Sequence, residues 1–153
     1  MNISSLDELG DLFADVLAEV VSTMTGFSLD VLSSERNADF DEMIGLMNLN
    51  GKESVTLFIS AEEDKMRVLC SFMIGVAIEN VTKDDIYDAL CELVNMTAGN
   101  AKLRLGGTDY MFKLSPPFAI SGKNMSITTL KKVHVVSRVL GCAEISVKLK
   151  LVY

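Results

Sequence analysis

The chain has 153 residues, of which 49% are hydrophobic, only two prolines and a formal net charge of −7. This length and composition predict one folded domain, residues 1–153, with a sizeable core. The acidic balance argues against nucleic acid as a partner, since phosphate binding needs a basic surface, and against a basic membrane-surface helix. No apolar run approaches the roughly 20 residues that cross a bilayer, so we expect no membrane partner.

Cysteine usage and the N-terminal residues bear on the compartment. Cys70, Cys91 and Cys142 are an odd number of widely spaced cysteines in apolar surroundings, which predicts three reduced, buried thiols. The first residues are acidic and lack the basic segment that opens a signal peptide. We therefore expect a cytoplasmic protein. His134 is the only histidine and has no partner at metal-ligand spacing, so we expect no metal ligand in this chain.

Residues 5–24 carry an apolar stripe at helical spacing, which predicts the first helix. Ser5 and Glu8 have the spacing of a capping box, and Gly26 marks the end of the helix. Apolar and polar residues then alternate over 27–31 and indicate a short strand. We expect this helix to pack on the core and assign it no chemistry.

The acidic tract 35–42 predicts a loop ahead of a β-hairpin. Two alternating runs, 43–49 and 54–60, flank Asn50 and Gly51. That dipeptide favours a two-residue type I′ turn, and a slightly longer loop is the alternative.

A second helix is predicted directly after the hairpin. Ser60 and Glu63 again have capping-box spacing, and Gly75 should close the segment. Several apolar residues recur at helical spacing and should point toward the core: Met66, Leu69, Cys70, Met73 and Ile74.

The longest helical pattern spans residues 82–105. Thr82 is a suitable N-cap with Asp85 three residues later, and Gly106 with Gly107 removes the helix preference at the far end. One broad face of this helix should pack on the core: Ile86, Leu90, Leu93, Val94, Thr97, Ala98 and Ala101.

The opposite face of this central helix is polar and holds Glu92 and Asn95 side by side, three residues apart. Gly99, one turn beyond Asn95, leaves a smooth spot where a partner could approach closely. Asn and an internal Gly lower helix stability, so a helix selected only for stability would hold other residues there. Periodicity alone leaves an alternative open, in which Asn95 is a tolerated surface residue and Gly99 a packing contact.

The remainder of the chain is a series of short strand patterns. Pro116 and Pro117 have no N–H donor and should interrupt the sheet. Together the segments predict an α+β fold, a mainly antiparallel β-sheet with long α-helices packed on one face, whose strand order does not follow from the sequence. The expected strands of this part are 110–114, 118–121, 125–129, 133–140 and 145–153.

No self-contained active site is visible in the sequence. It has no glycine-rich phosphate loop, no activated serine or cysteine constellation and no pocket signature. An exposed helix that carries one carboxylate and one carboxamide instead suits insertion into the active site of another protein.

The pattern Asp88-x3-Glu92-x2-Asn95 continues as NMTAG, and Pro116-Pro117 follow about twenty residues later. This arrangement resembles the CheC/CheX/FliY family of phosphatases, and its CheX members most closely. The tract LSPPFAISGKNMSI at 114–127 is also similar to the segment that follows the active helix in that family. Some members carry two active helices, whereas this chain has the E-x-x-N pattern on one.

The resemblance implies a phosphatase acting on a phosphorylated CheY-type response regulator, which carries an acyl phosphate on an aspartate, in bacterial chemotaxis signalling. Hydrolysis of that bond needs a water held in line with it. By resemblance Asn95 would orient this water, since its amide is both donor and acceptor and stays neutral beside a phosphoryl dianion. Glu92 would pair with the receiver's active-site lysine, which avoids repulsion by the phosphate.

Three further residues are implied to support the partner complex. Asp88 would serve docking or orientation, Gly99 would allow close approach, and Pro117 would set a loop beside the helix, unless it only bends a strand. The Mg²⁺ that the reaction needs would belong to the receiver, so this chain would hold no cofactor. The resemblance to CheX-like proteins implies a homodimer formed through sheet edges, so we expect a homodimer.

Two other interpretations stay open. The chain could be a non-catalytic docking or adaptor module that binds a receiver or a flagellar-switch protein, because fold does not settle function. It could also be a structural homodimer with no further partner. The presence of both Glu92 and Asn95 favours the enzyme.

Overall fold

A computed structural model describes residues 3–34, 39–126 and 133–153. In this part of the chain, seven strands form one sheet in which every pair of neighbours is antiparallel. The order is β1-β6-β7-β3-β2-β4, and β5 also pairs with β2. The strands are β1 Asp30–Ser33, β2 Met43–Asn50, β3 Ser54–Ala61, β4 Lys113–Leu114, β5 Phe118–Ser121, β6 Val135–Gly141 and β7 Ser146–Val152.

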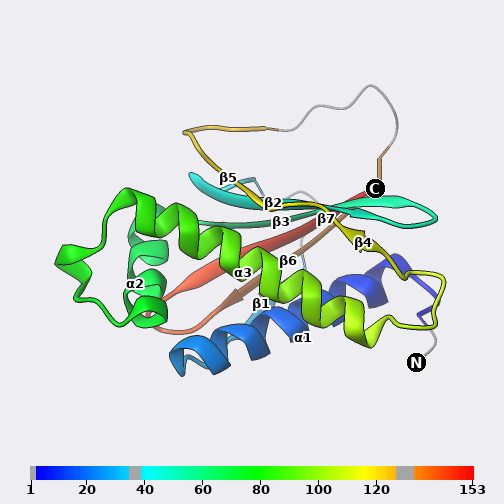
Figure 1. Cartoon of the computed structure of the whole chain (residues 1–153), viewed down its shortest axis with the longest axis horizontal. Helices are drawn as coiled ribbons and strands as arrows, with labels where there is room; N and C mark the ends of the chain where they lie inside the picture. The colour runs from blue at the N-terminus through cyan, green and yellow to red at the C-terminus, as the bar shows by residue number, and fades with distance from the viewer. Residues whose placement is uncertain (1–2, 35–38, 127–132) are drawn as a thin grey trace.

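Three α-helices lie on one face of this sheet (Figure 1), which confirms the predicted α+β architecture. α1 packs on β6 and β7, and α3 packs on β2, β3 and β5 beside α1. α2 covers the N-terminal end of α3. None of the described helices combines the length and the apolar character that crossing a membrane requires. The helices are α1 Leu6–Thr25, α2 Glu63–Ile74 and α3 Lys83–Arg104, with a short 3₁₀ segment, η1, at Ile78–Asn80.

The first helix forms as predicted, but only one of the two hydrogen bonds of its predicted capping box is present. The Ser5 hydroxyl accepts the Glu8 N–H at 3.2 Å, but the Glu8 carboxylate accepts the Ser4 N–H at 2.6 Å and not that of Ser5. The capping box is therefore half formed. Gly26 ends the helix at φ 81°, a left-handed conformation that glycine adopts without strain.

The β2–β3 hairpin is confirmed, but its turn is longer than the type I′ turn. Asn50 pairs with Ser54 in the ladder, so the loop has three residues, Gly51 to Glu53. A type I′ turn needs positive φ at both central residues, and neither Asn50 nor Gly51 has it. The Gly51 N–H donates to the Glu53 carbonyl at 3.3 Å, which closes the loop.

The predicted cap of the second helix is wrong. Ser60 is 1% exposed within β3, and its hydroxyl accepts the Asp41 N–H at 3.4 Å. Strand pairing extends to Ala61, opposite Met43, so the helix begins only at Glu63. Its N-cap residue Glu62 makes no side-chain cap, and the Glu63 N–H donates to the Glu42 carboxylate at 2.9 Å. Ile74, expected in the core, is 45% exposed near the end of the helix, and Gly75 closes it at φ 70°.

The short strands differ from their predicted bounds. Only Lys113 and Leu114 of the 110–114 run pair with β2, and Phe27 packs on Phe72 of α2 instead of joining β1. Pro116 and Pro117 interrupt the sheet as predicted. Residues 118–121 are confirmed as β5, and 146–152 and 135–141 carry most of the last two predicted strands. Of the run 125–129, residues 125–126 are not strand, and 127–129 lie outside the described residues.

The central helix is held at both its start and its middle. The Thr82 hydroxyl accepts the Asp85 N–H at 3.1 Å and the Asp85 carboxylate accepts the Thr82 N–H at 2.8 Å, a complete capping box. The hydrogen bond from the Thr82 N–H, and after it the Thr82 side chain, lowers the pKa of the Asp85 carboxyl. All seven residues of the predicted core face are buried: Ile86, Leu90, Leu93, Val94, Thr97, Ala98 and Ala101.

A glycine in β2 allows α3 to lie close to the sheet. A Cβ added at Gly45 would lie 2.7 Å from Val94 Cγ2 and 3.1 Å from the Leu90 carbonyl oxygen. Both atoms belong to the buried side of α3, so a side chain at position 45 would push the helix outward. The absence of a side chain at Gly45 therefore allows the short distance between α3 and the sheet.

We expect Gly45→Ala to lower the free energy of unfolding by about 1–3 kcal/mol, because the added methyl overpacks the helix–sheet contact. The matched control is Gly99→Ala, on the exposed side of α3, where an added Cβ meets no atom within 4 Å. That variant should be more stable than wild type by about 0.5–1 kcal/mol, the helix preference of Ala over Gly. Urea denaturation measures both, and equal stability of Gly45→Ala and wild type would contradict the packing argument.

Candidate functional site on the exposed face of α3

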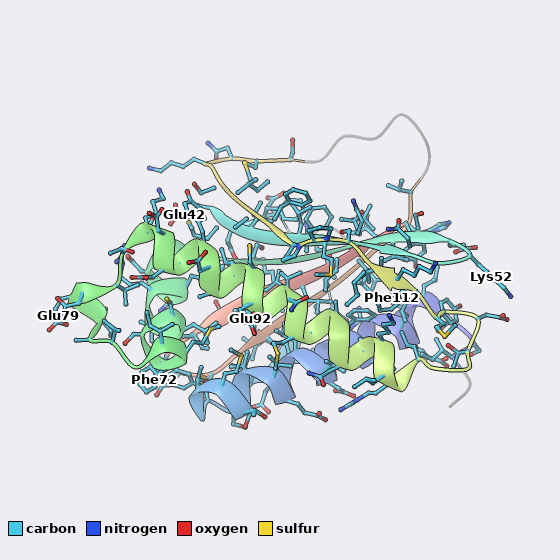
Figure 2. All side chains as sticks on the ribbon, in the orientation of Figure 1. Glu42, Lys52, Phe72, Glu79, Glu92 and Phe112 are labelled. Carbon is cyan, nitrogen blue, oxygen red and sulfur yellow. The ribbon has the colours of Figure 1, made fainter. Side chains whose placement is uncertain are left out.

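The exposed face of α3 brings together four of the five residues singled out by sequence. Asp88, Glu92 and Asn95 are exposed and Gly99 is half-exposed. At about 100° per residue these four positions fall within about 60° around the helix axis. Glu92 lies near the middle of α3 (Figure 2), away from both ends of the helix. The polar face is thus one continuous surface.

Three polar side chains of this face have no internal partner in the part of the chain that the structure describes. Among the described residues, Asp88, Glu92 and Asn95 make no hydrogen bond and no ion pair through their side chains. Other polar side chains of α3 do: Asp85 caps the helix and Arg104 pairs with Glu19 of α1. The carboxylate and the amide can therefore bind a partner without breaking an internal contact.

Gly99 is not a packing contact. An added Cβ at this position would meet nothing within 4 Å, apart from the helix's own neighbouring backbone. The alternative that Gly99 is a packing contact is therefore wrong. A partner can approach the α3 backbone most closely at this point.

Pro117 lies on a separate element, in the connection between β4 and β5, and is half-buried. The connection is fastened to β2, because the Ser115 N–H donates to the Asn48 carbonyl at 3.0 Å and the Asn48 N–H donates to the Ser115 hydroxyl at 2.9 Å. It leads into β5, which contacts α3. The structure thus places Pro117 next to the strand that flanks the helix, not on the helix face.

One contact that sequence patterns did not reveal joins α3 to β5. The Tyr87 hydroxyl and the Ser121 hydroxyl are 2.7 Å apart and form a hydrogen bond. Tyr87 lies one residue before Asp88, on the side of the helix that faces the sheet edge. The bond therefore holds β5 along the flank of the polar face. Sequence offered no signal for it, since the two residues are 34 positions apart.

Cys91 lies beside Glu92 but is not set up as a nucleophile. Burial, and after it the Asp88 charge, raises the pKa of its thiol, so the thiol stays protonated at neutral pH. All three cysteines are free in the structure. Cys70 of α2 is buried as predicted, whereas Cys91 and Cys142 are only half-buried and the predicted burial is wrong for them.

A cavity formed by the described residues lies away from the polar face of α3. This cavity of about 530 Å³ is lined by the start of α1, the β2–β3 loop and residues 107–112, and includes none of the α3 site residues. Within the described ranges, no three His, Cys, Asp or Glu side chains are grouped to hold a metal ion. An exposed carboxylate and amide on a helix ridge can enter a cleft of another protein but do not enclose a small molecule.

Comparison with known proteins gives the family. The model of the family described as chemotaxis phosphatase CheX matches residues 43–139, more than half of the chain, and the match includes all of α3 and the Pro116-Pro117 connection. The chain belongs to the CheX family. A search of curated protein sequences finds no significant match.

Three solved structures share the fold of nearly the whole chain. A CheC-like superfamily protein from Shewanella sp. PV-4 has a TM-score of 0.83 at 24% identity, with 97% of each chain covered. Chemotaxis protein CheX from Vibrio vulnificus has a TM-score of 0.81 at 20% identity, covering 94% of this chain and 97% of that one. A CheX–CheY–BeF₃–Mg²⁺ complex from Borrelia burgdorferi matches at 0.78 and 18% identity, covering 93% and 94%.

Proposed function

We propose that this CheX-family chain is a protein phosphatase that hydrolyses the aspartyl phosphate of a CheY-type response regulator. The observation that carries the proposal is the pair Glu92 and Asn95, exposed side by side on α3 with no partner among the described residues. Family membership and the CheX–CheY complex of Borrelia burgdorferi support a CheY-type receiver as the partner. The α3 ridge enters the receiver's phosphorylation site.

In this proposal Asn95 orients the attacking water. An acyl phosphate has a carboxylate leaving group, so its hydrolysis depends more on an in-line water than on a strong acid or base. The Asn95 amide can accept a hydrogen bond from the water through its oxygen and donate one to a phosphoryl oxygen through its nitrogen. It carries no charge, so it does not repel the phosphoryl group.

Glu92 anchors the helix by pairing with the receiver's active-site lysine. A carboxylate next to a phosphoryl group is favourable only if a cation lies between them or beside them. Glu92 is one turn before Asn95, so an ion pair at Glu92 fixes the rotation of α3 and with it the Asn95 amide. The Mg²⁺ bound by the receiver neutralises charge on the phosphoryl group.

The supporting residues act around this pair. Asp88 adds a second carboxylate one turn before Glu92, Gly99 lets the receiver approach the helix backbone, and Pro117 directs the connection that leads to β5. We further propose that the whole chain acts as one cytoplasmic domain and that it forms a homodimer through a sheet edge.

The first experiment compares the decay of phosphorylated CheY-type receivers of the same organism with and without this protein. Wild type should accelerate the decay of one of them. Glu92→Gln, which removes the charge and keeps the shape, should lower kcat/KM by about 30-fold or more, the equivalent of about 2 kcal/mol for a broken charge pair. The matched control is Glu79→Gln, an exposed glutamate in η1 at the end of the molecule that precedes α3 (Figure 2), which should leave kcat/KM within 2-fold (about 0.4 kcal/mol).

The outcomes separate the enzyme from a docking module. Accelerated decay that is lost in Glu92→Gln and kept in Glu79→Gln supports the phosphatase. Binding of a receiver with unchanged decay, for every receiver of the organism, would refute the enzyme and leave an adaptor.

A further inference from the structure

The polar face of α3 ends at an exposed apolar side chain, Leu103. Its exposed fraction, 79%, is the largest among the exposed large hydrophobic residues of the described chain. Leu103 lies eleven residues after Glu92. At about 100° and about 1.5 Å per residue, the two side chains therefore differ by about 20° around the helix and by about 16 Å along it.

The surface between Glu92 and Leu103 is open. Gly99 lies between them at nearly the same angle, and an added Cβ there would meet no atom within 4 Å. A single exposed leucine is ordinary on a protein surface. Leu103 differs because it continues the line of Glu92 and Gly99, so a partner that covers those residues and follows the helix must also cover the leucine.

The exposed strip of α3 that runs from Asp84 to Leu103 has two halves of different charge. Asp84, Asp88 and Glu92 are exposed carboxylates in the N-terminal half, and none of them has an ion-pair partner among the described residues. Lys102 is the exposed cation beside Leu103, while Arg104 is already paired with Glu19. The partner surface must therefore be basic where it contacts the acidic half of α3 and apolar where it contacts Leu103.

We propose that Leu103 is an apolar anchor for the receiver and that the acidic half of α3 selects receivers with a basic rim around the phosphorylation site. The inference rests on the proposed function and deepens it, because it names the receiver features that the site recognises. The receiver would carry cations beside its phosphoaspartate and an apolar hollow about 16 Å away along the line of α3. Burial of Leu103 in that hollow supplies affinity, and the carboxylates supply orientation and encounter rate.

The test of the anchor is the dissociation constant for the organism's CheY-type receivers loaded with beryllium fluoride and Mg²⁺. Leu103→Gln should raise Kd by about 10-fold, the effect expected for losing the burial of one leucine side chain. The maximal rate of dephosphorylation should stay unchanged, because Leu103 is about 12 Å along the helix from Asn95. The matched control is Leu32→Gln, an exposed leucine of β1 at 61% exposure, which should leave Kd within 2-fold (about 0.4 kcal/mol).

The test of the acidic half is the salt dependence of association. The double variant Asp84→Asn with Asp88→Asn should lower the association rate by about 10-fold at low salt and less at high salt, since screening removes the attraction. Asp64→Asn, an exposed aspartate of α2, is the control and should change the rate less than 2-fold (about 0.4 kcal/mol).

These outcomes distinguish the anchor from the enzyme. An active wild type with equal Kd for Leu103→Gln and wild type overturns the anchor and leaves the phosphatase. A receiver that binds through Leu103 but decays no faster overturns the phosphatase and leaves the anchor. An equal loss of affinity in Leu32→Gln, or the absence of binding to every receiver of the organism, overturns the anchor as well.

Discussion

Replacing Asn95 with Ala is expected to lower the catalysed rate of receiver dephosphorylation by about 100-fold or more at saturation. The amide would be the group that holds water in line, and loss of one positioned hydrogen-bonding group in an active site costs about 10²–10³ in rate. Binding should change little, because Glu92 and the remainder of the α3 face stay in place. Stopped-flow decay of the phosphorylated receiver at saturating protein gives the rate, and titration of the beryllium fluoride form gives Kd.

The control for this variant is Asn100→Ala. Asn100 is a half-buried asparagine of the same helix whose amide donates to the Met96 carbonyl at 3.0 Å, so it does not reach the exposed face. It should keep the wild-type rate. Asn95→Asp should be at least as slow as Asn95→Ala, because a carboxylate next to the phosphoryl group repels it. A wild-type rate in Asn95→Ala would show that another group orients the water.

The second large effect is expected in the free energy of unfolding, at Arg138 of β6. Arg138 is 5% exposed, and its guanidinium binds α1: Nε donates to Asp11 Oδ1 at 2.8 Å and Nη2 donates to the Asp7 carbonyl at 3.1 Å. A third nitrogen donates to the Ser137 carbonyl at 2.9 Å. Gly10 lies over this side chain, because an added Cβ there would be 3.4 Å from Arg138 Nη2. The arginine thus fastens α1 to the sheet.

We expect Arg138→Ala to lower the free energy of unfolding by about 3 kcal/mol, since it removes several charge-assisted bonds and leaves a space under α1. The control is Arg104→Ala, which removes the ion pair between α3 and Glu19, because the Arg104 side chain is 35% exposed and that of Arg138 only 6%. That change should cost less than about 1 kcal/mol, as for other surface pairs. Urea denaturation of both variants measures the difference.

A third variant separates packing from charge. Arg138→Met keeps most of the side-chain length, so recovery of the loss in this variant would assign it to packing, and persistence would assign it to the ion pairs. Equal, small losses in Arg138→Ala and Arg104→Ala would contradict the fastening role of Arg138.

Local patterns predicted the elements whose residues depend on their near neighbours. The core face of α3 and its capping box formed as expected, because a periodicity of 3.6 and a cap three residues apart are properties of one helix. The same reasoning failed at Ser60, which has capping-box spacing to Glu63. Ser60 pairs with Ile44 in the sheet, so it belongs to the strand and does not cap the helix. It also failed at residues 110–112. The Met111 N–H donates to the Thr108 carbonyl there and forms a turn, so the strand begins only after these residues.

The candidate site was likewise predicted only in part from local patterns. The E-x-x-N pattern predicted which residues share a helix face, and the structure places Asp88, Glu92, Asn95 and Gly99 there. The sequence could not show that this face is open. That result depends on which side of α3 the sheet and α1 cover, and so on contacts between residues far apart in the chain.

The sequence by itself determined the family and the chemistry that the exposed face of α3 can offer, because residue spacing on a helix decides which side chains stand together. Only the tertiary structure decided how that face is presented. Gly45 allows α3 to lie close to the sheet, and the Tyr87–Ser121 hydrogen bond holds β5 beside α3. Leu103 is exposed to solvent near the C-terminal end of α3. Each of these depends on the path of the chain through space, since strand order and close approach are set by pairs of segments and not by either segment alone.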